Sequence, residues 1–288
     1  MEYCKINEKI FKLWKEFNND LEKQFQKLDI KNYIPYFFTE EFQDPPDILF
    51  IGCNPSITDK TIGDNSFSDY YFENFKNEEK ITDTKNKTFY KIQEQDKKLA
   101  SELMYFKKIK EVSDYVSPNC NWQHIDLLYI RCTKQKNVEQ LIHDENLKKF
   151  ISEQQKITME VIKKIKPKII VVINALASKL FKEINNDYIK FNEKSGYYDF
   201  NYEEEFSCSC FFSSMLSGQR ALDNESLLRL KWHIKKCYNK KLKNSSCNKL
   251  PSLINDTVCK FYKTTTSLPF HPNARCLCCL QCKQCEFL

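Results

Sequence analysis

The stretch that most constrains this chain is Pro45–Ser56, PPDILFIGCNPS, in which chain breakers enclose a short apolar run. Two prolines end the preceding segment, and Ile48–Ile51 then supply consecutive apolar residues. Such a run is typical of a strand buried on both faces of a parallel sheet. Gly52 ends the run, and an Asn-Pro-Ser turn follows it. The stretch predicts a central strand with polar groups at its carboxyl end, where open α/β folds bind ligands. A buried strand with an ordinary loop is the alternative.

Segments with helical periodicity alternate with further strand-like runs. The β-branched run KIIVVIN, Lys168–Asn174, is the clearest signal of a parallel strand. Other strands are expected over His124–Arg131 and Ser207–Ser213, and helices over Ile6–Ile30, Phe89–Val112, Val138–Lys166, Ala175–Ile184 and from Asp223 or Asn224 to about Tyr238. A minor hairpin or a loop is expected over Tyr188–Phe200. This alternation predicts an α/β fold with three layers, α/β/α, around a central, mostly parallel, four-stranded sheet.

The composition indicates a soluble, mildly basic globular protein. Hydrophobic residues make up 41% and charged residues 29% of the 288, as in ordinary globular proteins. A net charge of +6 permits nucleic-acid binding without requiring it. The N-terminus is charged throughout, and no stretch is long and apolar enough to span a bilayer. We expect a cytoplasmic protein (nuclear if the cell has a nucleus), a monomer with no membrane partner, and 14 reduced cysteines.

The character of the chain changes near residue 243. The α/β domain is expected over residues 1–243, and residues 244–288 form a basic, cysteine-rich tail that is disordered or accessory. Within the tail, Cys279, Cys282 and Cys285 follow one another at zinc-like spacing, but a zinc site ordinarily takes two separated pairs. A metal site in the tail therefore stays one alternative. The candidate site residues of the domain are assigned neither a metal nor a cofactor.

Four of the expected strand ends carry polar or turn-forming residues. They are Gly52-Cys53-Asn54-Pro55-Ser56, Asp126, Asn174 and Met215-Leu216-Ser217-Gly218-Gln219-Arg220. In this order they resemble the motifs of the uracil-DNA glycosylase superfamily. That family has Gly-x-Asn-Pro after its first strand, a base-reading residue on the next, a strand preceded by Pro-Lys, and His-Pro-Ser or Asn-Pro-Ser-Gly after the last. Here Pro167 and Lys168 precede the β-branched run, and Ser217-Gly218 match the end of the last motif. The resemblance covers roughly residues 40–240.

The resemblance implies a monofunctional DNA glycosylase of base-excision repair, which hydrolyses the N-glycosidic bond of a flipped-out damaged or deaminated base, uracil or a related one. Asn54 would be the catalytic residue, holding the attacking water by its amide carbonyl rather than removing a proton. Turn formation is its alternative role. The base would be bound by Gly52, Cys53, Asp126, Asn174, Met215 and an aromatic ring from Tyr70, Tyr71 or Phe72. DNA, the expected partner, would be bound by Ser56, Ser217, Gly218, Gln219 and Arg220.

Two departures from the family pattern bear on activity. Met215 stands where the family has His or Asn, and it cannot donate a hydrogen bond to the departing base. Loss of such a donor costs about 2.7–4 kcal/mol of barrier lowering. Asp126 stands where several branches have Asn, and an ionised carboxylate, which only accepts, would favour a base edge rich in donors. A one-residue slip of the alignment, or pairing of Asp126 with a nearby Lys or Arg, is the alternative.

These departures keep a second function open, namely an inactive glycosylase-fold module that binds DNA or nucleotides. An unrelated α/β hydrolase is disfavoured because no G-x-S-x-G elbow occurs. An iron–sulfur cluster is not expected either. The branches that carry one have a Cys-x-x-Cys pair near the N-terminus, and here only Cys4 lies there.

Overall fold

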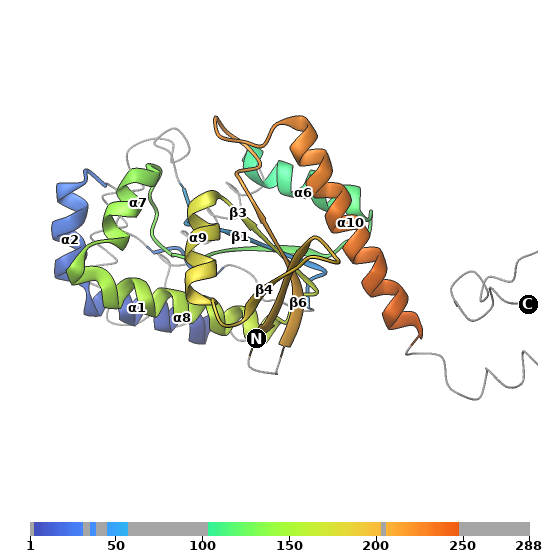
Figure 1. Ribbon diagram of the computed structural model, residues 1–288. Coiled ribbons are helices and arrows are strands. Elements are labelled where there is room, and N and C mark those ends of the chain that lie inside the picture. Colours follow the sequence, from blue (N-terminus) through green and yellow to red (C-terminus); the bar gives the residue numbers. More distant parts are fainter. Residues whose placement is uncertain (1–2, 31–34, 39–44, 57–102, 203–205, 248–288) are drawn as a thin grey trace, which may run out of the picture. The chain divides into compact units, whose positions relative to one another are not determined.

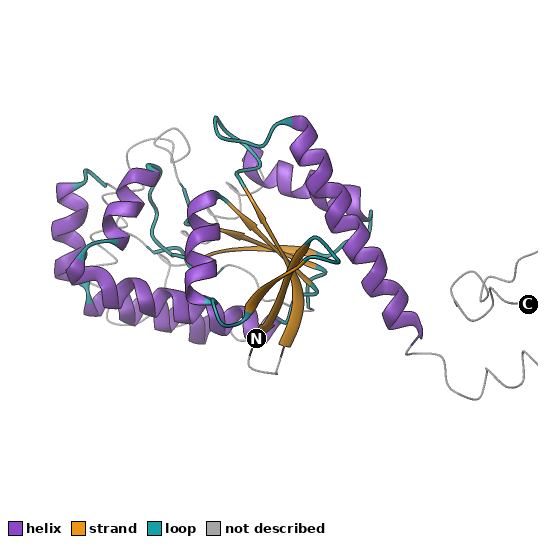
Figure 2. Cartoon of the chain, viewed as in Figure 1, coloured by secondary structure: helices purple, strands orange, loops and turns teal. Residues whose placement is uncertain are grey.

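The computed structural model describes residues 3–30, 35–38, 45–56, 103–202 and 206–247 (Figure 1, Figure 2). The helices within these residues are α1 (Tyr3–Glu16), α2 (Asn18–Lys27), α6 (Met104–Val116), α7 (Gln135–Ile142), α8 (Lys148–Ile165), α9 (Ala175–Ile184) and α10 (Asn224–Cys247), and a 3-10 turn, η1, lies at Glu145–Leu147. The strands are β1 (Ile48–Gly52), β2 (Trp122–Asp126), β3 (Ile169–Ile173), β4 (Ile189–Asn192), β5 (Tyr197–Tyr202) and β6 (Phe206–Ser213). The chain divides into two units, Met1–Lys235 and Lys236–Leu288, and the site described below belongs to the first.

The strands form one six-stranded, mostly parallel sheet in the order β2-β1-β3-β6-β5-β4. Strands β2, β1, β3 and β6 are parallel to one another, and β5 and β4 follow as antiparallel neighbours of β6. The α/β class is therefore confirmed. The expectation of four strands was wrong, because the segment that was expected as a minor hairpin or a loop adds two strands to the β6 edge.

A tight turn accounts for that added hairpin. Gly196 takes a left-handed φ of 77° and donates its N–H to the carbonyl of Asn192 at 2.8 Å. The Asn192 side chain accepts the N–H groups of Lys194 and Ser195. The strands themselves are short and mixed in polarity, since Phe200 is buried and its neighbour Asn201 is exposed. Hydrophobicity alone is a weak signal for such strands.

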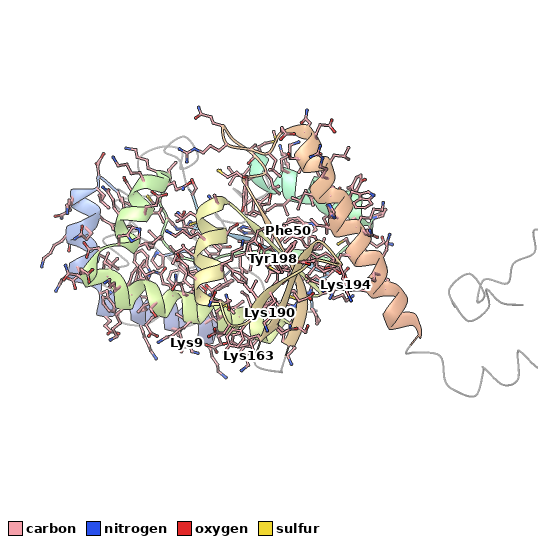
Figure 3. All side chains as sticks on the ribbon, in the orientation of Figure 1. Lys9, Phe50, Lys163, Lys190, Lys194 and Tyr198 are labelled. Carbon is pink, nitrogen blue, oxygen red and sulfur yellow. The ribbon has the colours of Figure 1, made fainter. Side chains whose placement is uncertain are left out.

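The central strands are buried on both faces. All residues of β1 and β3 are buried, and alternate residues of a strand point to opposite faces. Leu49 and Ile51 belong to the main core together with residues of α1, α8 and α9. Phe50, labelled in Figure 3, belongs to the other face and is fully buried. Its ring packs edge-on against that of Trp122. On that face α6 contributes buried residues from Ile109 to Val116.

Several element boundaries differ from the sequence-based expectation. The strand expected over His124–Arg131 is β2, Trp122–Asp126, because its partner β1 ends at Gly52, which pairs with Asp126. The helix expected over Val138–Lys166 is divided between α7 and α8, where Asp144 accepts the N–H of Asn146 and starts η1. The first helix is likewise divided into α1 and α2.

The last helix begins where it was expected. The Asp223 carboxylate accepts both the N–H and the hydroxyl group of Ser226, at 2.9 and 2.6 Å, which is N-cap geometry. This helix, α10, continues to Cys247 rather than ending near Tyr238. None of the helices in the described part of the chain is long and apolar enough to cross a membrane.

Candidate functional site

The four parallel strands bring the predicted site residues to one edge of the sheet. Carboxyl ends of parallel strands meet at the same edge, and the register confirms this here, since Gly52 pairs with Asp126 and Ile173 pairs with Ser213. The Cys53–Ser56 turn, Asn174 and the Met215–Arg220 segment each follow one of these ends directly. Tyr70, Tyr71 and Phe72, the proposed stacking aromatics, lie outside the described residues.

Gly52 is the point on which several polar side chains converge. A Cβ atom at this position would lie 2.1 Å from Asp126 Oδ1 and 3.0 Å from both His124 Nε2 and Tyr105 Oη. The residue does not have a positive φ, unlike Gly196 and Gly218. Glycine is needed here because other side chains approach its backbone closely. It is not needed to supply the positive φ of a turn.

These four residues, Gly52, Tyr105, His124 and Asp126, form what we call the Gly52 cluster. Tyr105 comes from α6, while His124 and Asp126 stand two residues apart on β2 and so share one face of the sheet. The Tyr105 hydroxyl and His124 Nε2 are 3.0 Å apart and share a hydrogen bond. His124 Nε2 lies 3.9 Å from Asp126 Oδ1, beyond hydrogen-bonding distance. The ring of His124 is also flanked edge-on by the ring of Tyr105.

Burial sets the charge states of this cluster. The side chains of His124 and Asp126 are only 11% and 9% exposed. Burial lowers the pKa of His124 from 6.5 to about 3, so the imidazole is neutral at physiological pH. Burial raises the pKa of Asp126 from 3.8 to about 7, although the Arg131 guanidinium acts in the opposite direction. A carboxyl group poised near neutral pH can donate as well as accept a proton.

Cys53 is buried beside the cluster and does not have the properties of a nucleophile. Burial raises the pKa of its thiol, and the nearby Asp126 carboxylate raises it further. The thiolate is the reactive form of cysteine. Burial and the same carboxylate also raise the pKa of the Tyr105 hydroxyl well above 10. Both groups therefore stay protonated at physiological pH, and Cys53 is available only as a packing residue or a weak hydrogen-bond donor.

Asn54 ties the β1 turn to the segment that follows β2. Its Nδ2 donates to the carbonyl of Cys132 at 2.7 Å and to the carbonyl of Ile130 at 3.0 Å. An amide nitrogen carries two hydrogens, and both are engaged by these carbonyls. The remaining polar atom, Oδ1, is an acceptor, as needed to hold a water. Asn54 thus has a structural role in the turn, and Oδ1 is the atom left for the catalytic role predicted from the sequence.

Asn174 begins helix α9 from a strained backbone. Its φ is 104° with ψ 136°, a region that non-glycine residues rarely adopt, and its Oδ1 accepts the N–H of Leu176 at 2.7 Å. The residue is therefore the N-cap of α9. Backbone strain of this kind costs about 1–3 kcal/mol and gathers at functional sites. Because Oδ1 is used for capping, Nδ2 is the group with which Asn174 could contact a ligand.

The segment between β6 and α10 forms a closed loop that stands away from the sheet (Figure 1). Met215 bridges to Ala221, and its carbonyl accepts the N–H of Leu222 at 2.9 Å. Gly218 takes a left-handed φ of 90° at the tip, next to exposed Gln219 and Arg220. Leu216 is 3% exposed and anchors the loop. Ser217 is half-buried, and Ser56, two residues after Asn54, is exposed.

Sequence reasoning missed two members of the cluster. His124 had a detectable signal, because a residue two positions from Asp126 on a strand shares its face. Tyr105 had none, since it belongs to a helix distant in sequence from both strands. The described residues contain no group of three or more His, Cys, Asp or Glu side chains arranged to hold a metal ion.

Comparison of the chain with protein-family models, with curated proteins and with solved structures finds no match. The residues at this edge of the sheet are therefore the basis on which a function is assigned.

Proposed function

We propose that this protein is a DNA glycosylase that hydrolyses the N-glycosidic bond of a flipped-out, damaged or deaminated base at the carboxyl edge of its parallel strands. The observation that carries the proposal is the convergence of Gly52, Asn54, Asp126, Asn174 and the 215–220 loop at this edge. The scaffold we propose is a three-layer one, with helices on both faces of the parallel strands. Such edges are where open α/β folds bind ligands.

Each residue has a definite part in the proposed reaction. Water adds to C1′ of the sugar while the bond to the base breaks, and the electron pair of that bond leaves with the base as an anion. The proton that the water loses passes to the solvent, from which the base anion is protonated. Asn54 orients the water through Oδ1, and this positioning lowers the barrier of the reaction. An amide is too weak a base to remove a proton from the water. Asp126, buried against Gly52, binds the edge of the base. Buried, preorganised polar groups stabilise the charge that develops on the leaving group.

The loop after β6 suits DNA. Ser217 and the N–H of Gly218 would contact phosphates beside the flipped nucleotide, and the absence of a side chain at Gly218 permits close approach. Arg220 and Gln219 are exposed at the tip. In that position one of them can enter the gap that the flipped-out nucleotide leaves in the DNA duplex. Alternatively, Arg220 can hold a DNA phosphate through two hydrogen bonds. The net charge of +6 favours such a partner. We propose that the protein acts as a monomer, in the cytoplasm or nucleus.

A base-release assay tests the proposal. The full chain is incubated with single- and double-stranded oligonucleotides that contain uracil, hypoxanthine, xanthine or a thymine mismatch, and abasic sites are revealed with alkali. We expect release of one base and its loss in Asn54→Ala.

The matched control is Asn7→Ala. Asn7 lies on helix α1, is 2% exposed, and makes a pair of hydrogen bonds to the backbone of Phe38, of 3.1 and 2.9 Å. It should lose stability as Asn54→Ala does but keep activity. Equal loss of activity in both variants would contradict a catalytic role for Asn54.

The second candidate is a binding module of the same fold. Two observations favour it: the amide hydrogens of Asn54 are engaged by backbone carbonyls, and Oδ1 of Asn174 caps α9. Both asparagines therefore have structural reasons to be present. Tight binding of an abasic oligonucleotide by folded protein, with no release of any tested base, would favour this module over the enzyme.

A further inference from the structure

The Asp126 carboxyl group has unusual surroundings for an acidic side chain. It packs against the backbone of Gly52, so closely that a Cβ there would lie 2.1 Å from Oδ1. Tyr105 from α6 and His124 from β2 converge on the same point. A position this enclosed leaves the carboxyl group little solvation, and its charged form is costly there.

The groups that face Asp126 offer little compensation for a negative charge. They are Tyr105 from α6, Cys53 after β1, His124 on β2, and Tyr129 and Arg131 after β2. Burial keeps the imidazole and both hydroxyls neutral at physiological pH, and the thiol is protonated. Arg131 is the cation of this set, and its effect is outweighed by burial, so that the pKa of Asp126 stands at about 7.

Tyr105 has a specific effect on this arrangement. Its hydroxyl group is hydrogen-bonded to His124 Nε2 at 3.0 Å, which occupies the imidazole nitrogen nearest to Asp126. His124 Nε2 is thereby kept from pairing with the carboxyl group 3.9 Å away. If the Tyr105 hydroxyl were absent, Nε2 could accept the proton of Asp126 or hydrogen-bond to its anion, and either event would favour the ionised carboxylate.

We propose that Asp126 meets the substrate base as a neutral carboxyl group that donates one hydrogen bond and accepts another, and that Tyr105 and His124 are the positioning residues that keep it in this form. This inference rests on the proposed function. A neutral carboxyl group presents an O–H donor beside a C=O acceptor, the same pattern as an amide. It is complementary to a base edge on which a ring N–H lies beside a carbonyl.

The substrate class that follows is a base with a lactam or imide edge, such as uracil, hypoxanthine or xanthine. The expectation drawn from an ionised carboxylate was the reverse, a base edge rich in donors. The two forms of Asp126 are therefore distinguished by pH. The neutral fraction of a group with a pKa near 7 falls about tenfold between pH 6 and pH 8, and activity on a lactam base should fall with it.

The first experiment measures the carboxyl group itself. The full chain is labelled with ¹³C at the aspartate carboxyl carbon and titrated by NMR between pH 4 and pH 9, and the Asp126 signal is assigned by its disappearance in Asp126→Asn. We expect a midpoint near pH 7, and a midpoint at least one pH unit lower in Tyr105→Phe. Tyr115→Phe is the matched control, since it removes a hydroxyl from the same helix, outside the Gly52 cluster, and should leave the midpoint unchanged.

Two results would overturn the inference: a wild-type midpoint near pH 4, or the same midpoint in Tyr105→Phe and wild type. The second experiment follows base release from a uracil or hypoxanthine oligonucleotide between pH 6 and pH 8. We expect about a tenfold fall for the wild type and less than a twofold change for Asp126→Asn, whose amide keeps the donor and acceptor at every pH. Parallel pH profiles for these two proteins would also refute the inference.

The two experiments separate this inference from the proposed function. If no base is released at any pH while Asp126 titrates near pH 7, the glycosylase proposal fails and the assignment of Tyr105 and His124 as positioning residues stands. If base is released while Asp126 titrates near pH 4, the glycosylase proposal stands and the inference fails.

Discussion

Replacing Asp126 with asparagine should stabilise the folded protein, and the gain should grow with pH. Asparagine keeps the shape of the side chain but cannot ionise. In the folded protein the pKa of Asp126 is raised from 3.8 to about 7. A group whose pKa is raised by folding is stabilising only while it is protonated, and its ionisation costs stability as pH rises from about 4 to about 7. At about 1.36 kcal/mol for each pH unit, the full cost is ~4 kcal/mol above pH 7.

His124 has the opposite effect on the pH dependence of stability, so it conceals the effect of Asp126 in the wild-type protein. Its pKa is lowered from 6.5 to about 3 by burial, so the unfolded chain takes up a proton first and stability is lost as pH falls below 6.5. Between about pH 4 and pH 6.5 the two trends nearly cancel in the wild type. Asp126→Asn removes one of them, so its stability should rise steadily over this interval.

The assay is equilibrium unfolding of the full chain in urea at pH 4.5, 6 and 8, followed by circular dichroism. We expect Asp126→Asn to exceed the wild type by ~4 kcal/mol at pH 8 and by only ~1 kcal/mol at pH 4.5. Asp114→Asn is the control, because Asp114 is an exposed carboxylate on α6 paired with Lys110, and exposed pairs of this kind contribute ~0.5 kcal/mol or less. A difference that is independent of pH, or that grows toward low pH, would refute the reasoning.

Substitutions at three further positions, Gly52, Asn54 and Asn174, probe the edge of the sheet by urea unfolding at a fixed pH. Gly52→Ala places a Cβ 2.1 Å from Asp126 Oδ1, so we expect a loss of ~1–3 kcal/mol; wild-type stability would contradict the close approach. Asn54→Ala removes hydrogen bonds to two carbonyls and should cost ~1–3 kcal/mol, as should Asn7→Ala. At Asn174 both replacements lose the N-cap, but glycine relieves the strain at φ 104°, so Asn174→Gly should exceed Asn174→Ala by ~1 kcal/mol; the reverse order would count against strain.

The buried parallel strands of this fold could be predicted from the sequence because their environment leaves a direct signature. Strands covered on both faces need continuous apolar runs, and Ile48–Ile51 and the KIIVVIN run both supply one. The hairpin of β4 and β5 lacks that signature, since it lies at the sheet edge and mixes exposed and buried residues. The ends of the strands were harder to predict from the sequence, because the length of β2 depends on where its partner β1 ends.

The candidate site could be predicted only as far as the strand ends. Parallel topology brings Gly52 and Asp126 together at one edge because they are the last residues of β1 and β2. The strand expected over His124–Arg131 would not have ended at Asp126. The convergence of Tyr105 on Gly52 depends on how α6 packs across the sheet, which no local pattern encodes. The raised pKa of Asp126 could not be predicted from the sequence for the same reason, because burial by residues distant in sequence sets it.

Direct detection of a released base tests the central claim most sharply. Strand breakage after alkali can also come from a nuclease, whereas a free base in solution arises only when the N-glycosidic bond is broken. The full chain is incubated with each oligonucleotide at pH 6.5, and the filtrate is examined by mass spectrometry. We predict free base from a lactam-type lesion with wild type and with Asn7→Ala, and none with Asn54→Ala. Folded protein that binds the oligonucleotides and releases no base from any of them would contradict the account.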